Sequence, residues 1–185
     1  METEDAHILL DCGPDFREQM LQMGGFDKLD GVLLTHEHYD HVGGLDDLRP
    51  FCREEEIPIF ADAYTAEHLR QRLPYCFVEH KYPGVPRIRL EVVEAGQPFQ
   101  IQQTEIMPVC VMHGKLPILG YRIGHCLGYV TDMLTMPDTS YDLLQGVDVL
   151  VMNALRIQPH QTHQCIDEAI RAAKRIGAAR TFFII

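Results

Sequence analysis

The chain has 185 residues, of which 46% are hydrophobic and 23% are charged, and its formal net charge is −11. This length and composition predict a single globular domain spanning residues 1–185. No apolar run reaches the roughly 18 to 20 residues that a membrane span needs, and the acidic N-terminus lacks the regions of a signal peptide. We therefore expect a cytoplasmic protein without a membrane partner.

The net charge bears on the protein's partners, and the cysteines bear on its redox compartment. It disfavours, without excluding, broad contact with a nucleic-acid backbone. The sequence leaves a homodimer open. The six cysteines are scattered, form no C-x-x-C pair and lie mostly in apolar segments. Free buried thiols in a reducing compartment are therefore expected rather than a disulfide framework or a zinc ribbon.

Over the first half of the chain, short apolar runs alternate with segments of helical periodicity. Strands are expected at 8–10, 32–34 and 57–60, and a turn at 11–14. A short helix with Phe16, Met20 and Met23 on one face should end at Gly24-Gly25. Two further helices are expected, one opened by Gly43-Gly44 with Leu45, Leu48 and Phe51 or Cys52 inward, and one over 63–73 with Ala66, Leu69 and Leu73 inward.

The second half begins with a change of period. Alternation of apolar and polar residues over 87–130 predicts an antiparallel meander that starts with Ile88, Leu90 and Val92. A strand at 147–152 and a helix at 162–176 follow, the helix with Thr162 as N-cap and Gly177 as its end. Its buried stripe is expected to be Ile166, Ala169, Ile170 and Ala173.

The last segment, 181–185, is apolar enough to predict a central strand. Because the chain ends on this run, we expect a domain shortened at its ends. Mixed parallel and antiparallel strands with flanking helices predict an α/β (α+β) fold with the helices outside.

Residues 35–41, Thr-His-Glu-His-Tyr-Asp-His, follow an apolar run and hold the sequence's strongest chemical signal. Imidazole and carboxylate groups are the ligands that zinc and similar divalent ions prefer, and this spacing brings His36, His38, Asp40 and His41 close together. A histidine-rich loop without metal is the alternative. The motif favours a metal site.

Further donors lie where other strands are expected to end. His113 precedes Gly114, Asp132 follows an apolar run, and His160 and His163 lie around the start of the late helix. Function often gathers at such positions. Taken singly, Asp132 also fits a turn or helix cap, and His113 fits a solvated loop.

Residues 35–45 together resemble the signature of the metallo-β-lactamase superfamily. Within it, the chain is most similar to the cyclic-phosphodiesterase branch associated with phosphonate breakdown, which is related to the tRNA 3′-processing endonucleases (RNase Z). The supporting segments are 9–15, 44–51, 129–132, 153–156 and 159–163, and the resemblance runs from about Ile8 to Phe183.

The resemblance implies a four-layer αββα sandwich and a binuclear metal centre. His36, His38 and His113 would hold one ion, Asp40 and His41 part of a second, and Asp132 would bridge them. Zn²⁺ is the expected metal, with Mn²⁺ or Fe as alternatives. Two ions roughly 3.5 to 4 Å apart provide a nucleophile at neutral pH and offset charge on phosphoryl oxygens.

Three more roles follow from the same resemblance. His163 is the candidate for protonating the leaving alkoxide, unless it only sits in the first helical turn; His160 is less favoured. Asp40 is assigned to the catalytic group as well as to the metal. Asp11 resembles the family's strand-end aspartate and would orient a ligand imidazole, with a plain Asx turn as the alternative.

Two departures from the family pattern affect this interpretation. The family has another metal-binding histidine after the last strand, where this chain reads 182–185 and ends, so the second site is incomplete in this sequence. Asn153 stands where the branch more often has a carboxylate.

The sequence therefore predicts a metal-dependent hydrolase of small or cyclic nucleotide-like phosphodiesters. An RNase Z-like nuclease, a lactonase or a thioesterase on the same metal chemistry is the alternative. A noncatalytic binding module of the same fold and a single-metal centre held by His36, His38 and His113 are further rivals.

Overall fold

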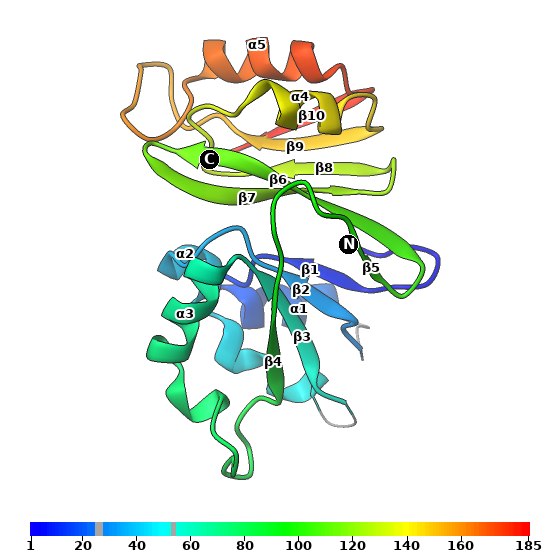
Figure 1. Cartoon of the computed structure of the whole chain (residues 1–185), viewed down its shortest axis with the longest axis vertical. Coiled ribbons are helices and arrows are strands. Elements are labelled where there is room, and N and C mark those ends of the chain that lie inside the picture. The colour runs from blue at the N-terminus through cyan, green and yellow to red at the C-terminus, as the bar shows by residue number, and fades with distance from the viewer. Residues whose placement is uncertain (25–27, 53–54) are drawn as a thin grey trace. The chain divides into compact units, whose positions relative to one another are not determined.

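The computed structural model describes residues 1–24, 28–52 and 55–185, so Gly25, the expected second residue of the first helix end, lies outside it. The described residues divide into two compact units: 1–93 with 101–103, and 94–100 with 104–185. Each unit contains one sheet and its own helices (Figure 1). The expectation of one domain over 1–185 stays a prediction.

The first unit is a four-stranded sheet in the order β1-β2-β3-β4, and every described strand pair in it is parallel. Its elements in chain order are β1 (Ile8–Leu10), α1 (Phe16–Met23), β2 (Gly31–Leu33), α2 (Tyr39–Val42), the 3₁₀ helix η1 (Leu45–Phe51), β3 (Ile57–Ala61), α3 (Ala63–Arg72), the 3₁₀ turn η2 (Pro74–Cys76) and β4 (Ile88–Val92).

One apolar core holds the helices of this unit against its sheet. Phe16 of α1, Leu45 and Leu48 of η1, and Leu69 of α3 pack with Val32 and neighbouring strand residues. The helix expected after Gly43-Gly44 is 3₁₀ and contains Pro50, which cannot donate a backbone hydrogen bond.

The second unit is built on a six-stranded sheet in the order β10-β9-β8-β7-β6-β5. The neighbours β6, β7 and β8 pair antiparallel, whereas β8-β9 and β9-β10 pair parallel. Its elements in chain order are β5 (Phe99–Ile101), β6 (Thr104–His113), β7 (Leu116–Ile123), β8 (Leu127–Val130), α4 (Asp138–Leu144), β9 (Val149–Asn153), α5 (Ile166–Ile176) and β10 (Arg180–Ile184).

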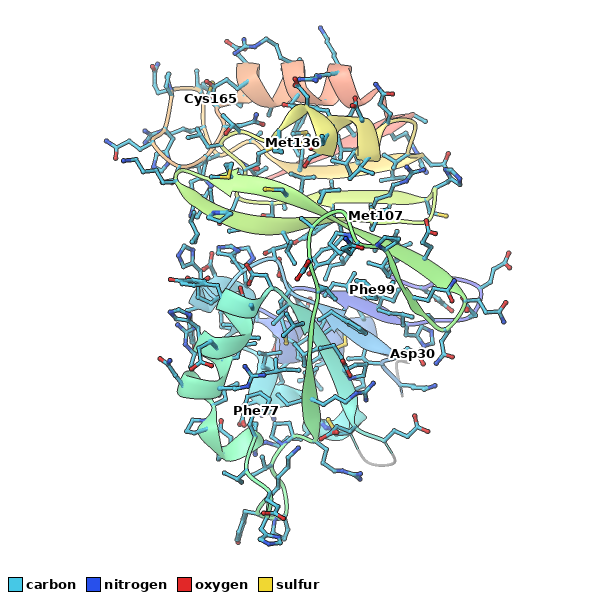
Figure 2. The ribbon with its side chains drawn as sticks, in the orientation of Figure 1. Asp30, Phe77, Phe99, Met107, Met136 and Cys165 are labelled. Carbon is cyan, nitrogen blue, oxygen red and sulfur yellow. The ribbon has the colours of Figure 1, made fainter. Side chains whose placement is uncertain are left out.

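Helices α4 and α5 cover one face of this sheet (Figure 1). Leu144 of α4 and Ala169, Ala172 and Ile176 of α5 belong to the same buried cluster as Val130 and Met152 of the strands. Met136, labelled in Figure 2, is part of this core as well.

The meander prediction is wrong at its first strand. Ile88 pairs in parallel with Ile57, so β4 belongs to the first sheet. Helix α3 crosses between β3 and β4 and returns the chain to the starting edge, which makes the pairing parallel. Alternation specifies a half-buried strand but not the strand that pairs with it.

The late helix begins four residues after its predicted start. Cys165 is the N-cap, and Glu168 accepts a hydrogen bond from the Cys165 backbone N–H at 2.9 Å, forming a capping box. Thr162 is therefore not the cap. The buried face contains Ala169, Ala172 and Ile176, whereas Ile166 and Ile170 are exposed, contrary to the predicted stripe. Gly177 ends the helix at a φ of 71°, as expected.

The final strand, β10, lies at an edge of its sheet rather than in the centre. It pairs with β9, and Phe182 is 53% exposed and Phe183 43% exposed. Hydropathy predicted burial on both sides, but among the described strands only β9 lies beside it. Within residues 1–24, 28–52 and 55–185, every helix falls short of the length and apolarity that crossing a bilayer requires.

Candidate metal centre

The histidine motif of the first unit is held against the turn that follows β1. The Cys12 N–H donates to the His41 carbonyl at 2.7 Å, and the Gly44 N–H donates to the Cys12 carbonyl at 2.8 Å. A Cβ atom on Gly13 would lie 2.4 Å from the Asp40 carbonyl oxygen, so only glycine fits this contact. The turn and the motif therefore form one close-packed layer that fixes the backbone of the donors.

Asp11 is the acceptor at the centre of this layer. Its Oδ1 accepts the Thr35 backbone N–H at 2.8 Å, the Thr35 hydroxyl lies within 3.1 Å of both carboxylate oxygens, and His41 Nδ1 lies 2.9 Å from Oδ2. Asp11 has a φ of 54°, a left-handed conformation that aspartate tolerates better than most residues. The carboxylate thus fixes the imidazole of His41, with Nε2 directed away from it.

The four donors of the motif form two pairs. His36 Nε2 lies 2.8 Å from His38 Nδ1, and His41 Nε2 lies 3.4 Å from an oxygen of Asp40. His36 Nδ1 contacts the Thr35 hydroxyl at 3.0 Å, so His36 Nε2 is the ring nitrogen that faces His38. Each pair supplies two of the ligand atoms that a divalent cation needs.

Glu37, between the first two histidines, is a buried residue with one unpaired atom. Its Oε2 has no hydrogen-bond partner among the described residues, while its backbone carbonyl accepts a bond from Arg72 Nη1 at 2.8 Å. A buried carboxylate oxygen without a partner is costly, and a cation nearby would lower that cost. The imidazole and carboxylate donors of the motif are the types that fit a bound divalent ion.

The second unit has its own donor group. His113 ends β6, and its Nδ1 contacts the Thr162 carbonyl oxygen at 3.1 Å, so Nδ1–H donates and Nε2 is left as the ligand atom. A nitrogen of His113 and an oxygen of Asp132 lie within 4.8 Å of each other. Asp132 follows β8 with a φ of 54°, and the Thr131 hydroxyl donates to its Oδ1 at 3.1 Å.

His163 lies beside this donor group, in the loop before α5 rather than in the helix. Its ring centroid is 4.6 Å from that of His113, and its Nδ1 is 4.0 Å from Asp132 Oδ1. The His160 ring lies beside that of His163, with centroids 5.1 Å apart and planes tilted by 39°. The structure therefore brings His163, Asp132 and His113 together within one unit.

Sequence reasoning missed three contributors. Thr35 holds both Asp11 and His36 through its hydroxyl, the Thr162 carbonyl orients His113, and Arg72 fixes the motif backbone from α3. Thr35 could have been suspected because it adjoins the motif. A backbone carbonyl and a distant arginine leave no signal in one sequence.

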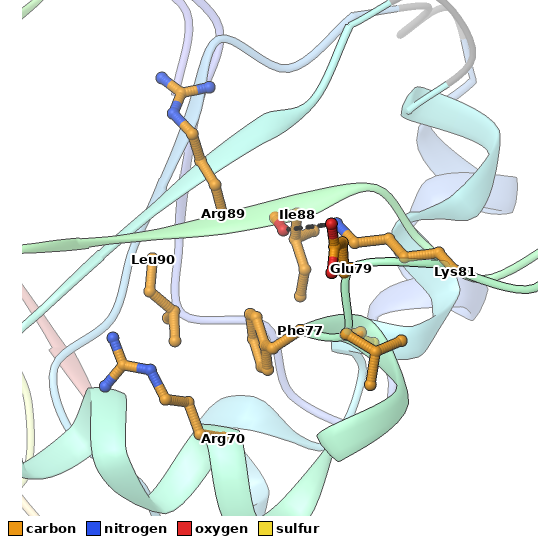
Figure 3. Close-up of a pocket in the computed structure, with 9 residues that line it drawn as sticks. Arg70, Phe77, Glu79, Lys81, Ile88, Arg89 and Leu90 are labelled. Atoms are coloured by element: carbon orange, nitrogen blue, oxygen red, sulfur yellow. Dashed lines mark hydrogen bonds between the residues drawn. The ribbon is translucent and has the colours of Figure 1, made fainter.

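A groove of about 440 Å³ in the first unit lies between the end of α3 and β4 (Figure 3). Its three cations, Arg70, Lys81 and Arg89, each pair with a glutamate, at N–O distances of 3.7, 2.7 and 2.9 Å. Figure 3 shows the Arg89 side chain extending away from Phe77 in the groove. Since its charges are engaged within the chain, we do not assign a ligand to this groove.

Fold and donors define a class, and the sequence comparison agrees: the chain belongs to the beta-lactamase superfamily, whose domain model matches residues 6–184. The fold class and family expected from the sequence are confirmed. The fold implies divalent-metal binding, and both units contain groups of histidine and aspartate that suit it.

The relatives place the chain within this class. A solved diphosphatase of the PhnP family has a TM-score of 0.88 and 34% identity, covering 98% of this chain and 69% of that one. An octanoyltransferase of Porphyromonas gingivalis is 43% identical over 96% of this chain and 36% of its own length. A ribonuclease Z of Acaryochloris marina is 30% identical over 64% of this chain and 38% of its own. The chain spans little more than a third of these two curated relatives.

Proposed function

We propose that the chain is a metal-dependent hydrolase of small phosphodiesters that uses a binuclear zinc centre. The orientation of the imidazoles carries this proposal. His36, His41 and His113 each have Nδ1 held by an acceptor of the chain, so that each presents Nε2 as a ligand atom. Three acceptors with the same effect favour a built metal site over a histidine-rich loop.

The roles proposed for the donors are those that the family resemblance implies. His36, His38 and His113 would hold one ion, Asp40 and His41 the other, and Asp132 both. When bound, the ions would supply a nucleophile at neutral pH and offset the charge of the phosphoryl oxygens. His163, packed against His113 and near Asp132, would donate the proton that the leaving alkoxide needs.

The name of the Porphyromonas gingivalis relative is a competing hint. The match takes in 36% of that protein, so its transferase activity is not assigned to this part. A covalent acyl step through a thiol needs a thiolate. Burial raises the pKa of the Cys76 thiol to about 11 and raises that of Cys12 further, which leaves both protonated at neutral pH.

The test is a hydrolysis panel with zinc analysis on the same sample. It contains bis(p-nitrophenyl) phosphate, a cyclic nucleotide, a lactone, an octanoyl thioester and a chromogenic β-lactam. We expect about two zinc ions per chain and turnover of the phosphodiesters; turnover of another ester alone would correct the substrate class, and no zinc with no turnover would favour a binding module.

The matched variants are Asp132→Ala and Asp142→Ala. The first removes the proposed bridging carboxylate, and we expect it to abolish turnover and lower the zinc content. The second removes an exposed carboxylate of α4 and should change neither. Full activity in Asp132→Ala would refute the shared carboxylate.

A further inference from the structure

Asn153, the last residue of β9, makes a two-bonded clip on one peptide unit. Its Oδ1 accepts the Met133 backbone N–H at 2.8 Å, and its Nδ2 donates to the Met133 carbonyl at 3.0 Å. Asn153 is 3% exposed and Met133 is fully buried, so water does not compete for these bonds. The reversed amide would place donor against donor, so the network itself fixes the orientation of the side chain.

The clipped residue directly follows Asp132, whose φ of 54° is the left-handed conformation. The Met133 carbonyl also accepts the Gln164 backbone N–H at 2.8 Å, next to His163. On the other side, the Leu134 N–H donates to the Met112 carbonyl at 2.8 Å, next to His113. The segment after Asp132 is therefore tied to the two elements that carry His113 and His163.

The geometry points to Asn153 as a positioning residue for the Asp132 carboxylate and, through Gln164, for the His163 ring. This inference rests on the proposed function, because it concerns the same metal centre. Both side-chain hydrogen bonds given for Asn153 go to Met133, so it acts through the Met133 peptide unit.

The clip also explains why an amide stands where the family pattern more often has a carboxylate. The Met133 peptide unit presents one donor and one acceptor, and an asparagine side chain matches both. An ionised aspartate is an acceptor only, so it would satisfy the N–H and place negative charge against the carbonyl oxygen. In this chain the amide does not replace a catalytic carboxylate; it completes a backbone contact.

The test compares Asn153→Asp, which is isosteric but lacks the donor, with Asn153→Leu, which lacks both groups. Ser140→Ala is the matched control, because it removes another buried hydrogen bond of the second unit, from the Ser140 hydroxyl to the Cys110 carbonyl at 2.8 Å. Zinc affinity, kcat and KM for bis(p-nitrophenyl) phosphate are measured below the melting temperature of each variant. Amide exchange of residues 131–135 is measured on the zinc-free protein.

We expect both Asn153 variants to lose about tenfold or more in zinc affinity and in kcat, by analogy with other groups that orient metal ligands. KM should stay within twofold, and the Met133 amide should exchange faster. Ser140→Ala should lower the melting temperature without changing zinc affinity or kcat. If the hydrogen bonds of Asn153 only stabilise the fold, the Asn153 variants should instead behave like this control.

The outcomes separate the two proposals. If the wild-type protein binds zinc and turns over, but the folded Asn153 variants match it within twofold, the positioning role is wrong and the proposed function stands. If the wild-type protein binds no zinc, both are wrong. If Asn153→Leu does not fold, the isosteric Asn153→Asp decides alone.

Discussion

Replacing Asp11 by asparagine tests the proposed metal centre through a group that is not itself a ligand. In the structure the Asp11 carboxylate accepts the Thr35 N–H through Oδ1 and faces His41 Nδ1 through Oδ2, at 2.8 and 2.9 Å. An asparagine keeps the first bond and tolerates the φ of 54°, but it can place an N–H against His41 Nδ1. His41 would then carry its proton on Nε2, the atom that a metal needs.

The expected effect is a loss of affinity without a comparable loss of fold. Groups that orient metal ligands typically contribute 10- to 100-fold in affinity, about 1.4 to 2.8 kcal/mol. Since His41 belongs to the Asp40 pair, one of two zinc equivalents should weaken by this amount. The contacts with Thr35 and His41 are replaced by neutral hydrogen bonds and none is left unmade, so stability should fall by roughly 1 to 2 kcal/mol.

The assay is a competition titration of zinc against a chromophoric chelator, with thermal unfolding on the same samples. Asp15→Asn is the matched control, because it makes the same change of charge on an exposed side chain that makes no capping hydrogen bond to α1. If Asp11→Asn retains two zinc equivalents of wild-type affinity, the reasoning that Asp11 fixes the tautomer of His41 is refuted.

Three other perturbations have definite expectations. His163→Ala should slow turnover tenfold or more and leave bound zinc unchanged, since general acids contribute roughly 10²- to 10⁴-fold; loss of zinc in inductively coupled plasma analysis would make it a ligand. Gly13→Ala forces a Cβ against the Asp40 carbonyl at 2.4 Å, so chemical denaturation should show about 1 to 3 kcal/mol lower stability; an unchanged midpoint would contradict this. The exposed Cys126 should react with a thiol reagent at pH 8 in the native protein, whereas Cys76, buried and with its pKa raised to about 11, should react only on unfolding; equal rates would show that burial does not protect it.

The sequence predicted the local features of the fold better than the pairing of strands. The buried runs at β1, β2 and β3 and the left-handed end of α5 at Gly177 were found because each depends on adjacent residues. The parallel pairing of β4 depends on a crossover, and the edge position of β10 depends on which strands lie beside it. Hydrophobic periodicity specifies neither the crossover nor which strands lie beside a given strand.

The start of α5 shows the same limit at one residue. A threonine ahead of an apolar stripe is the usual N-cap signal, and Thr162 has it. The structure uses Cys165 instead, because Glu168 three residues later completes a capping box. Cys165 is buried in the fold, and its side chain is labelled in Figure 2.

For the site, the donors could be named from the sequence but their orientation could not. The residue types and spacing of the motif are local, so His36, His38, Asp40 and His41 are found directly. The histidines are suitable ligands when one ring nitrogen is held by an acceptor and the other is left for a metal. Which nitrogen is held depends on contacts with residues such as Asp11, 30 positions from His41.

The two strand-end aspartates, Asp11 after β1 and Asp132 after β8, share a φ of 54°. A left-handed residue other than glycine costs roughly 1 to 2 kcal/mol, and glycine would remove this cost. Glycine would also remove the carboxylate that receives Thr35 and His41 in one unit, and the one beside His113 in the other. The same strain at two separate strand ends is therefore explained by the carboxylates that it places. Asparagine tolerates the left-handed conformation without the charge, so at either position it separates the effect of the backbone geometry from that of the carboxylate.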